Sequence, residues 1–338
     1  MSTNKLQKRN FSIGKFLAEW GPVAAIPLLF LIFTCIDPKT YLGWNNILTI
    51  LRSAAIYLIV AMGSTFAFSC GVFDLSVGST VTLGGMFAIT FQSLYGMPWW
   101  LACLATIAAC MIIGAVNAIL VLKFKIPGVL ATLSMQFILS GLALTYSAGQ
   151  VITATKANRP TQTVVREVPQ IFWDLGKAPW IIVIALVCVA LVAIFQNKIK
   201  HGRYLYMVGE NEEAARLSGI RVNRYRTLAF LMTTVFAAIG GTVMAARNGS
   251  VATTAGAAYL MPAIAAVNIG RSVAGVNKPN AIGSFVGVML WTVLDNGLLM
   301  VGVPYYMVDM AKGAILLLTL IIVNMSSISG ARRKFAKK

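Results

Sequence analysis

Apolar runs long enough to cross a bilayer recur along the whole chain, and they restrict its fold more than any other feature. A helix needs roughly 20 predominantly apolar residues to span the hydrocarbon core. Backbone polar groups in lipid must be satisfied within the segment, so each run is expected to be helical. The sequence therefore predicts an all-α polytopic membrane protein with about ten transmembrane helices. The runs lie at 20–36, 47–68, 72–94, 99–122, 128–148, 179–196, 227–246, 256–272, 280–300 and 305–324.

The proportion of charged residues excludes a soluble globular protein. Of the 338 residues, 58% are hydrophobic and only 11% are charged, whereas soluble domains carry about 25% charged residues. A soluble fold of this size could not bury so much apolar surface. None of the polar segments is long enough to bury a core of its own, so we expect no soluble domain.

The distribution of basic residues predicts the orientation in the membrane. With the N-terminus inside, 20 of the 28 Lys and Arg residues fall in inner segments, as the positive-inside rule requires. The net charge of +18 therefore indicates loops facing an anionic leaflet rather than a nucleic-acid-binding face. An even number of spans keeps both basic termini on the inner side.

This orientation gives one membrane domain with polar ends and two long loops. No small-residue cleavage site follows the first run, so we expect an uncleaved first span rather than a signal peptide. The predicted parts are a cytoplasmic basic N-terminus 1–19, a transmembrane domain 20–325 with an external loop 149–178 and a cytoplasmic loop 197–226, and a cytoplasmic tail 326–338.

The cytoplasmic loop contains a short segment with well-defined helix ends. Asn211 suits an N-cap, acidic residues follow it where the helix dipole favours negative charge, and Gly219 suits the left-handed C′ position. The small and apolar side chains of such a helix suit a groove on a partner, although an ordinary solvated connector has the same pattern. The candidate residues are Glu210, Asn211, Glu212, Glu213, Ala214, Ala215, Arg216, Leu217 and Gly219.

A second segment, Gly71 to Ser79, lies between two apolar runs and carries an aspartate. Asp74 is expected to cap the following helix by accepting from the amide near Val77. A carboxylate at membrane depth is costly and frequently functional, so both a plain cap and a place on a solute pathway remain open.

Amide side chains within the predicted spans need hydrogen-bond partners in lipid. Gln92, Asn117 and Asn268 are expected to bridge helices, as is usual for such residues. Asp309 and Lys312 are spaced to pair as i and i+3, which predicts a structural ion pair near the outer interface. The candidates for a translocation pathway are Asp74, Ser76, Gln136 and Asn296.

Motifs for catalysis and metal binding are missing from the sequence. The five cysteines lie in or beside apolar runs without a CxxC pair, so we expect apolar fillers rather than disulfides or a zinc site. The chain has no HExxH, no Ser–His arrangement and no P-loop. These features predict no catalytic site and no metal site, and they leave an ion-coupled secondary transporter as the main alternative.

Ordered motifs over nearly the whole chain resemble the ribose/galactose/xylose-type permeases of ABC importers. Gly71 to Ser79 is similar to that family's GGIDLSVGS signature, and Gly209 to Gly219 is similar to its GGNExAARLSGI loop. Further matches follow in the family's order, at residues 237–241, 263–267, 282–284, 296–298, 302–304 and 312–313.

The resemblance implies a type II-like ABC importer permease bundle in the bacterial inner membrane. It implies a homo- or heterodimer of permeases, two cytoplasmic ATPase subunits that hold ATP and Mg, and an extracytoplasmic solute-binding protein. It also implies that the capped loop is the coupling helix, with Glu212, Ala214, Ala215, Arg216 and Gly219 matching its motif. No cofactor is expected on this chain.

Departures from the family pattern bear on the solute. Tyr259 is followed by Leu260, Met261 and Pro262 where the family often has an acidic residue, and Gly270 precedes Arg271 rather than a second glycine. The Pro262 form resembles the branch that imports autoinducer-2. The resemblance therefore implies import of a monosaccharide or sugar-like solute, with autoinducer-2 as an alternative.

Overall fold

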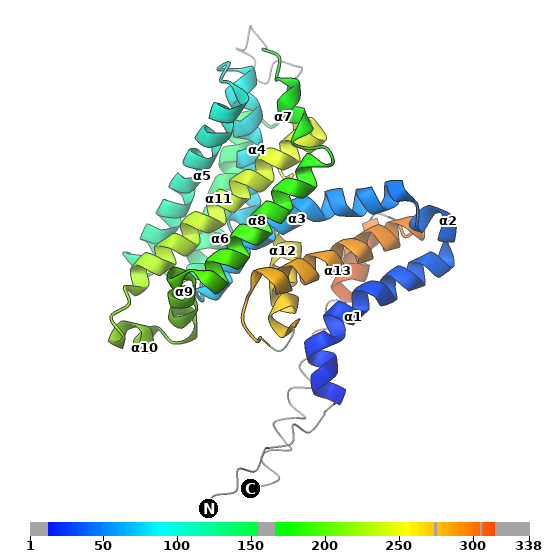
Figure 1. The fold of residues 1–338 in the computed structure, drawn as a ribbon. Coiled ribbons are helices and arrows are strands. Elements are labelled where there is room, and N and C mark those ends of the chain that lie inside the picture. Colours follow the sequence, from blue (N-terminus) through cyan, green and yellow to red (C-terminus); the bar gives the residue numbers. More distant parts are fainter. Residues whose placement is uncertain (1–12, 155–165, 274–275, 305, 315–338) are drawn as a thin grey trace, which may run out of the picture.

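The described chain folds into a single helical bundle (Figure 1). The computed structural model describes residues 13–154, 166–273, 276–304 and 306–314. Its helices are α1 (Ile13–Ile36), α2 (Pro38–Tyr41), α3 (Trp44–Ser69), α4 (Val77–Ser93), α5 (Trp99–Leu122), α6 (Gly128–Ser147), α7 (Gln170–Asp174), α8 (Trp180–Lys198), α9 (Lys200–Glu210), α10 (Glu212–Leu217), α11 (Val222–Asn248), α12 (Ala257–Ser272) and α13 (Ala281–Met300). Two short strands, β1 (Ile152–Thr153) and β2 (Ser250–Val251), pair antiparallel.

Six of the described helices are long and apolar enough to cross a membrane: α3, α5, α6, α8, α11 and α13. This finding confirms a mostly helical polytopic membrane protein. The predicted number of ten spans is not confirmed, because α4 and α12 are shorter at 17 and 16 residues and the part of α1 whose side chains the structure describes begins at Trp20 and is also shorter than a candidate span. Most of the tenth predicted run, 305–324, lies outside the described residues.

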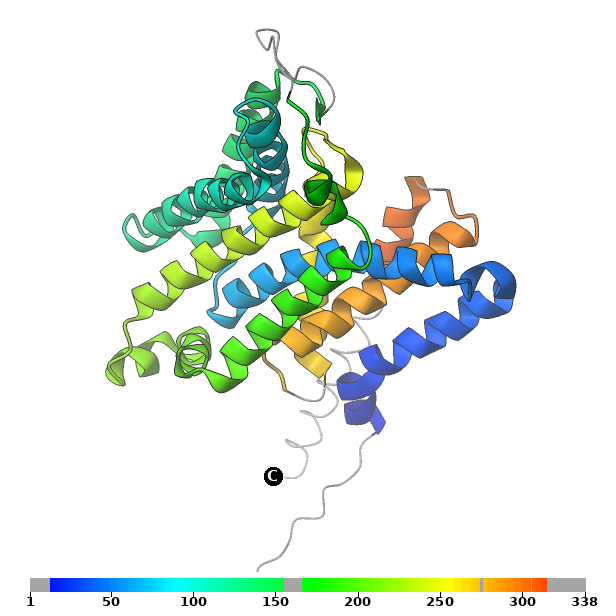
Figure 2. The same cartoon turned by 45° about the horizontal axis from the view of Figure 1, so that its top comes forward.

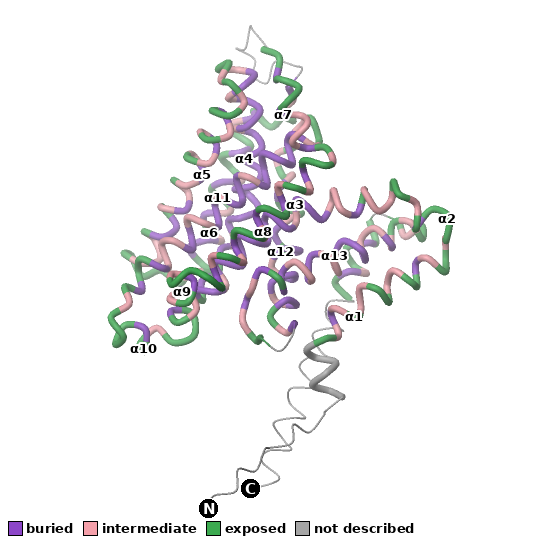
Figure 3. The backbone as a smooth tube through the Cα atoms, in the orientation of Figure 1, coloured by how far each residue is buried: buried purple, intermediate pink, exposed green. Residues whose placement is uncertain are grey.

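Helix α11 forms the centre of the bundle and packs against α3, α4 and α5. It is buried over most of its length, as Figure 3 shows. A Cβ atom at Gly241 would overlap the Val81 carbonyl oxygen of α4, and one at Gly85 would lie 3.0 Å from the Gly241 carbonyl oxygen. Small residues thus allow the two backbones to approach closely, as is typical of helix packing in lipid.

The polarity of the bundle is inverted relative to a soluble protein. Large apolar side chains on the outer faces of α5, α6 and α8 are exposed, for example Ile112, Phe137 and Leu191. Hydroxyl groups lie inside, and many bond to the carbonyl four residues earlier, as Thr80 does with Ser76 at 2.9 Å. An apolar exterior with internally satisfied polar groups is what a lipid solvent requires.

The two ends of α11 carry different small elements. Helix α10 contacts its first turn, whereas α7 packs near its last turn, where Gly176 lies against the Arg247 backbone. Helices α1 and α13 form one side of the bundle, away from α5 and α6, in both views (Figures 1 and 2). We call the end that carries α9 and α10 the α10 end.

Two sequence-based boundaries are wrong. The helix that the apolar run 72–94 predicts begins only at Val77. Residues 71–76 form a loop instead, which starts at Gly71 with φ +71°. The loop 197–226 is also more helical than expected, since α9 precedes α10 and α11 begins at Val222 rather than 227. The buried residues of α9, Gly202, Leu205 and Val208, recur every three residues, so its amphipathic pattern is a signal that the sequence analysis missed.

Candidate functional site

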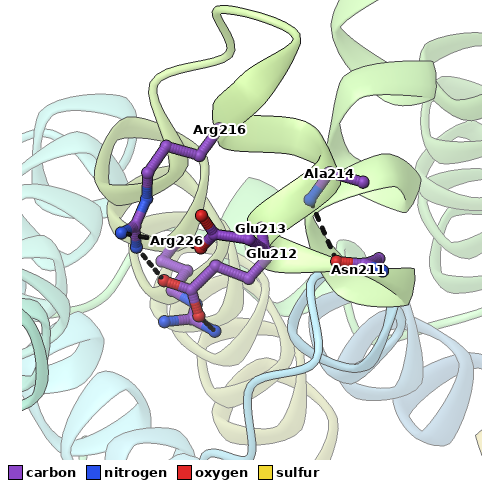
Figure 4. Close-up of polar contacts among 6 residues, drawn as sticks. All are labelled: Asn211, Glu212, Glu213, Ala214, Arg216 and Arg226. Atoms are coloured by element: carbon purple, nitrogen blue, oxygen red, sulfur yellow. Dashed lines mark hydrogen bonds and ion pairs between the residues drawn. The ribbon is translucent and has the colours of Figure 1, made fainter.

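Helix α10 has the end structures that the sequence predicts. The Asn211 side chain accepts from the Ala214 amide at 3.0 Å, which caps the N-terminus (Figure 4). At the other end Gly219 has φ +78°, and the Ile220 amide donates to the Ala215 carbonyl at 3.0 Å. This left-handed C-cap requires glycine or asparagine-like freedom, so both boundaries of the helix are encoded locally.

Glu212 connects α10 to the bundle through two arginines. One carboxylate oxygen lies 2.9 Å from Arg216 on the same helix, and the other lies 2.9 Å from Arg226 near the start of α11 (Figure 4). Glu213 lies 3.8 Å from Arg216. Because these side chains are partly exposed, each pair contributes at most about 1 kcal/mol. Their main effect is to fix the orientation of α10 on α11.

The two faces of α10 differ in burial. Ala215 is buried against the bundle, whereas Leu217 is 82% exposed and Ala214 is also exposed. An apolar side chain this exposed at the end of a capped helix suits insertion into a groove on a partner. The helix therefore presents one fixed face to the chain and one free face outward.

Helix α9 packs tightly on the ends of the spanning helices. A Cβ atom at Gly209 would overlap the Ser69 carbonyl oxygen at the end of α3, and one at Gly202 would overlap the Phe195 carbonyl oxygen of α8. Both glycines are thus needed for backbone contact. The backbone of α9 is therefore in direct contact with the ends of α3 and α8.

A buried hydrogen-bond network joins these helix ends to α13. The Gln196 side chain donates to Ser69 Oγ at 3.1 Å and accepts from the Ala281 amide at 3.0 Å. Ser69 Oγ and Tyr206 Oη both donate to the Pro279 carbonyl, at 3.1 and 2.7 Å. One glutamine thus connects α8, α3 and α13, and a tyrosine connects α9 to the same point.

An ion pair adds a second connection between α9 and the segment before α13. Lys278 lies 2.7 Å from Glu210 and 5.7 Å from the centre of the Tyr206 ring. The sequence analysis missed Gln196, Ser69, Tyr206 and Lys278 as parts of this site. The bonded residues are up to 210 positions apart in the sequence, and nothing in their local sequence distinguishes them from other polar residues at helix ends.

Asp74 does not cap α4 as predicted. Its Oδ1 accepts from the Ser76 amide at 2.9 Å and from Ser76 Oγ at 2.6 Å, one residue short of the helix. Asn117 of α5 donates to Ser76 Oγ at 2.9 Å. The carboxylate is 5% exposed, and its Oδ2 has no hydrogen-bond partner in the described chain. Asp74, Ser76 and Asn117 therefore form one buried polar cluster.

We predict that the Asp74 side chain maintains the loop before α4. Asp74→Ala leaves the two Ser76 donors unpaired and should lower the stability by about 2 kcal/mol, since a buried unpaired donor costs about 1–3 kcal/mol. Asp74→Asn keeps an oxygen acceptor and should stay within about 1 kcal/mol of the wild type. Thermal unfolding of the purified variants measures both. Equal stability of the Ala variant and the wild type would exclude this role.

The remaining pathway candidates lie in different parts of the bundle. The main-chain carbonyl of Gln136 on α6 accepts from Ser79 at 3.1 Å, near the Asp74 cluster. Asn296 on α13 instead donates to Asn46 Oδ1 of α3 at 2.9 Å. Asn296 is a helix bridge as expected for such amides, whereas Gln92 and Asn268 donate to carbonyls of their own helices and do not bridge.

Lys312 lies in a buried charge cluster. It pairs with Asp309 at 3.3 Å, as the spacing predicts, but it also pairs with Asp295 of α13, which the sequence analysis missed. Its ammonium lies 5.5 Å from the centre of the Trp291 ring. The Lys312 side chain is 10% exposed and that of Asp295 is 21% exposed, whereas Asp309 is almost fully exposed. Asp295 is therefore the principal counter-charge.

We expect Lys312→Met to destabilise the chain strongly, because it leaves the mostly buried Asp295 without its cation. Breaking a buried pair costs about 3–5 kcal/mol. The double variant Lys312→Met with Asp295→Leu removes both charges and should recover most of that loss. Melting temperatures in detergent compare the two variants, and a double variant less stable than the single one would contradict the pairing.

The described residues contain no group of three or more His, Cys, Asp or Glu side chains placed to hold a metal ion. All five cysteines are free thiols. The chemical groups of the site are thus hydrogen-bond donors and acceptors, ion pairs and an exposed apolar helix face.

Comparisons with known proteins cover nearly the whole chain. Residues 46–320 match the model of a family described as branched-chain amino acid transport system / permease component. The chain is 30% identical to the ribose import permease protein RbsC of Haemophilus influenzae, over 95% of this chain and 97% of that protein. No solved structure matches the chain significantly.

Two further relatives are named for other solutes. The autoinducer 2 import system permease protein LsrC of Escherichia coli is 30% identical, over 90% of this chain and 86% of that protein. The galactose/methyl galactoside import permease protein MglC of Escherichia coli is 29% identical, over 97% of this chain and 99% of that protein. Similar proteins thus carry different small solutes.

Proposed function

The chain belongs to the branched-chain amino acid transport system / permease component family, and from this premise we propose that it is the membrane-spanning permease subunit of a sugar ABC importer. It is a transport component and not an enzyme. The observation that supports this function most directly is α10, a doubly capped helix whose Leu217 is 82% exposed. That helix follows α9, whose backbone lies directly against the ends of α3 and α8 at Gly209 and Gly202.

We place the α10 end on the cytoplasmic side of the bacterial inner membrane. Basic residues concentrate in 197–226 and at both chain ends, in agreement with the positive-inside rule. In this arrangement residues 20–325 form the membrane domain with ten spans, 149–178 is external, and the termini 1–19 and 326–338 are cytoplasmic. The short α4 and α12 then cross the bilayer together with the loops that precede them.

The motor is proposed to be a separate ATPase that holds ATP and Mg and receives Leu217 and Ala214. Closure of the ATPase pair moves α10, and the Gln196 network passes that movement to α3, α8 and α13. A second permease copy, identical or different, completes the pathway, and a solute-binding protein delivers the solute to the α7 end. Asp74, Ser76, Gln136 and Asn296 are the proposed polar residues of the pathway.

The proposed solute is a monosaccharide or sugar-like molecule, because relatives at similar identity are permeases for ribose, galactose and autoinducer 2. Autoinducer-2 remains the alternative, in keeping with Pro262 inside α12. Binding of pentoses, hexoses and autoinducer-2 to the partner solute-binding protein distinguishes them.

Uptake in cells that contain the chain, its ATPase and its binding protein tests the function. Depletion of ATP is expected to stop uptake, whereas collapse of the proton and sodium gradients at maintained ATP should leave it intact. The reverse result would assign the chain to the ion-coupled secondary transporters.

A further inference from the structure

A cavity of about 530 Å³ lies between α8 and α11 at the α10 end, outside the network described above. Its lining residues are Phe195, His201, Arg224, Tyr225, Leu228 and Leu231, with Thr227 beside them. The aromatic and leucine side chains form apolar walls, and the basic and hydroxyl side chains gather at one end. None of these lining residues is acidic.

The polar end of the cavity is organised around Tyr225. His201 Nδ1 lies 2.8 Å from the Tyr225 hydroxyl, and the Tyr204 ring packs edge-on against Tyr225 at 5.9 Å. Arg224 is exposed and has no ion-pair partner within the described part of the chain, in contrast to Arg226, which pairs with Glu212. A guanidinium of the cavity lining is thus without a counter-ion in the described part of the chain. Such a group binds phosphate oxygens in a bidentate manner.

The apolar lining residues extend from Arg224 along α11 toward the middle of the proposed membrane-spanning region. Leu231 follows Arg224 by seven residues on α11, which corresponds to about 10 Å along a helix axis. On α8, the exposed Leu191 and Ile194 continue the apolar surface next to Phe195. The cavity therefore leads from a basic rim at the helix ends to side chains that face hydrocarbon.

We propose that this cavity binds one anionic phospholipid of the inner leaflet, with its phosphate at Arg224 and His201 and its upper acyl chain against Phe195, Leu228 and Leu231. Basic pockets between spanning helices on the cytoplasmic side bind anionic headgroups. The apolar depth favours a lipid over a soluble anion, which would leave those walls uncovered. The inference rests on the proposed orientation of the α10 end, but it requires neither the ATPase nor the solute.

Native mass spectrometry of the purified full-length permease tests the proposal with phosphatidylglycerol and phosphatidylcholine of identical chains. We expect retention of one phosphatidylglycerol in preference to phosphatidylcholine. Arg224→Gln should reduce its retention about fivefold or more, since a basic residue near an anionic surface contributes about that factor. Arg203→Gln removes the same charge from an exposed position of α9 that does not line the cavity, and it should change retention less than twofold.

A third variant tests the apolar part of the cavity, and competition with inorganic phosphate tests whether a soluble anion binds instead of a lipid. Leu228→Trp fills the apolar part without a change of charge and should also release the lipid, even if Arg224→Gln misfolds. Equal losses in the Arg203 and Arg224 variants, equal retention of both lipids, or displacement of phosphatidylglycerol by millimolar inorganic phosphate would overturn the proposal. Failure of the ATPase to associate with α10 would contradict the proposed function and leave these lipid measurements unaffected.

Discussion

Leu217→Glu is expected to weaken association of the ATPase about 30-fold or more while the permease itself remains folded. Leu217 is 82% exposed at the end of α10, so the new charge meets water in the free chain and should change stability by less than about 0.5 kcal/mol. In the complex the same charge would be buried in an apolar groove without a partner. Loss of a central anchor costs about 2 kcal/mol or more, which corresponds to about 30-fold weaker binding.

Copurification of the ATPase with the permease, followed by uptake, measures this effect. Ile171→Glu is the matched control, because Ile171 is a 56% exposed apolar residue on α7 at the other end of the bundle. It should retain the ATPase at the wild-type level. If the Leu217 variant binds the ATPase as tightly as the control, the exposed face of α10 is not the docking surface.

Gly209→Ala is expected to destabilise the contact between α9 and α3 at the α10 end. The added Cβ would overlap the Ser69 carbonyl oxygen and lie 3.0 Å from the Ser69 carbonyl carbon. Both are backbone atoms and cannot rotate away. Such overpacking costs about 1–3 kcal/mol. Because α9 must then separate from α3, uptake should fall even where the protein remains folded.

Gly141→Ala provides the same chemical change without the contact. Gly141 lies within α6, and no atom outside its own helix backbone comes within 4 Å of its added Cβ. This variant should be neutral or stabilised by up to about 1 kcal/mol, as expected for alanine in a helix. Thermal unfolding and uptake of the two variants compare them directly. Similar behaviour of both would show that the contact between α9 and α3 does not carry the coupling.

Local signals in the sequence were sufficient to locate most of the long helices, six of which are candidate spans, and to locate α10. The apolar runs located nine helices of the described chain to within several residues, because length and hydropathy decide membrane insertion. Asn211 and Gly219 marked the ends of α10 correctly, since both caps depend on residues within one turn. Where conformation follows from neighbouring residues, sequence reasoning was adequate.

Contacts between distant residues were not predictable in this way. The Gln196 side chain bonds to Ser69 and Ala281, at separations of 127 and 85 residues. Asp295 is paired with Lys312, although the i, i+3 rule pointed only to Asp309. Asp74 bonds to Ser76 rather than to an amide of the helix because the loop approaches Asn117 of α5. Each of these depends on how helices pack, which a single sequence does not encode locally.

The most direct test of the account is a photo-reactive residue at position 217 in inverted membrane vesicles that contain the permease and its ATPase. Irradiation is expected to give a covalent adduct between the two chains, and the adduct should disappear when the ATPase is washed off. A position 217 that forms no adduct and is labelled instead by an impermeant reagent from the opposite face would contradict ATP-driven import through α10.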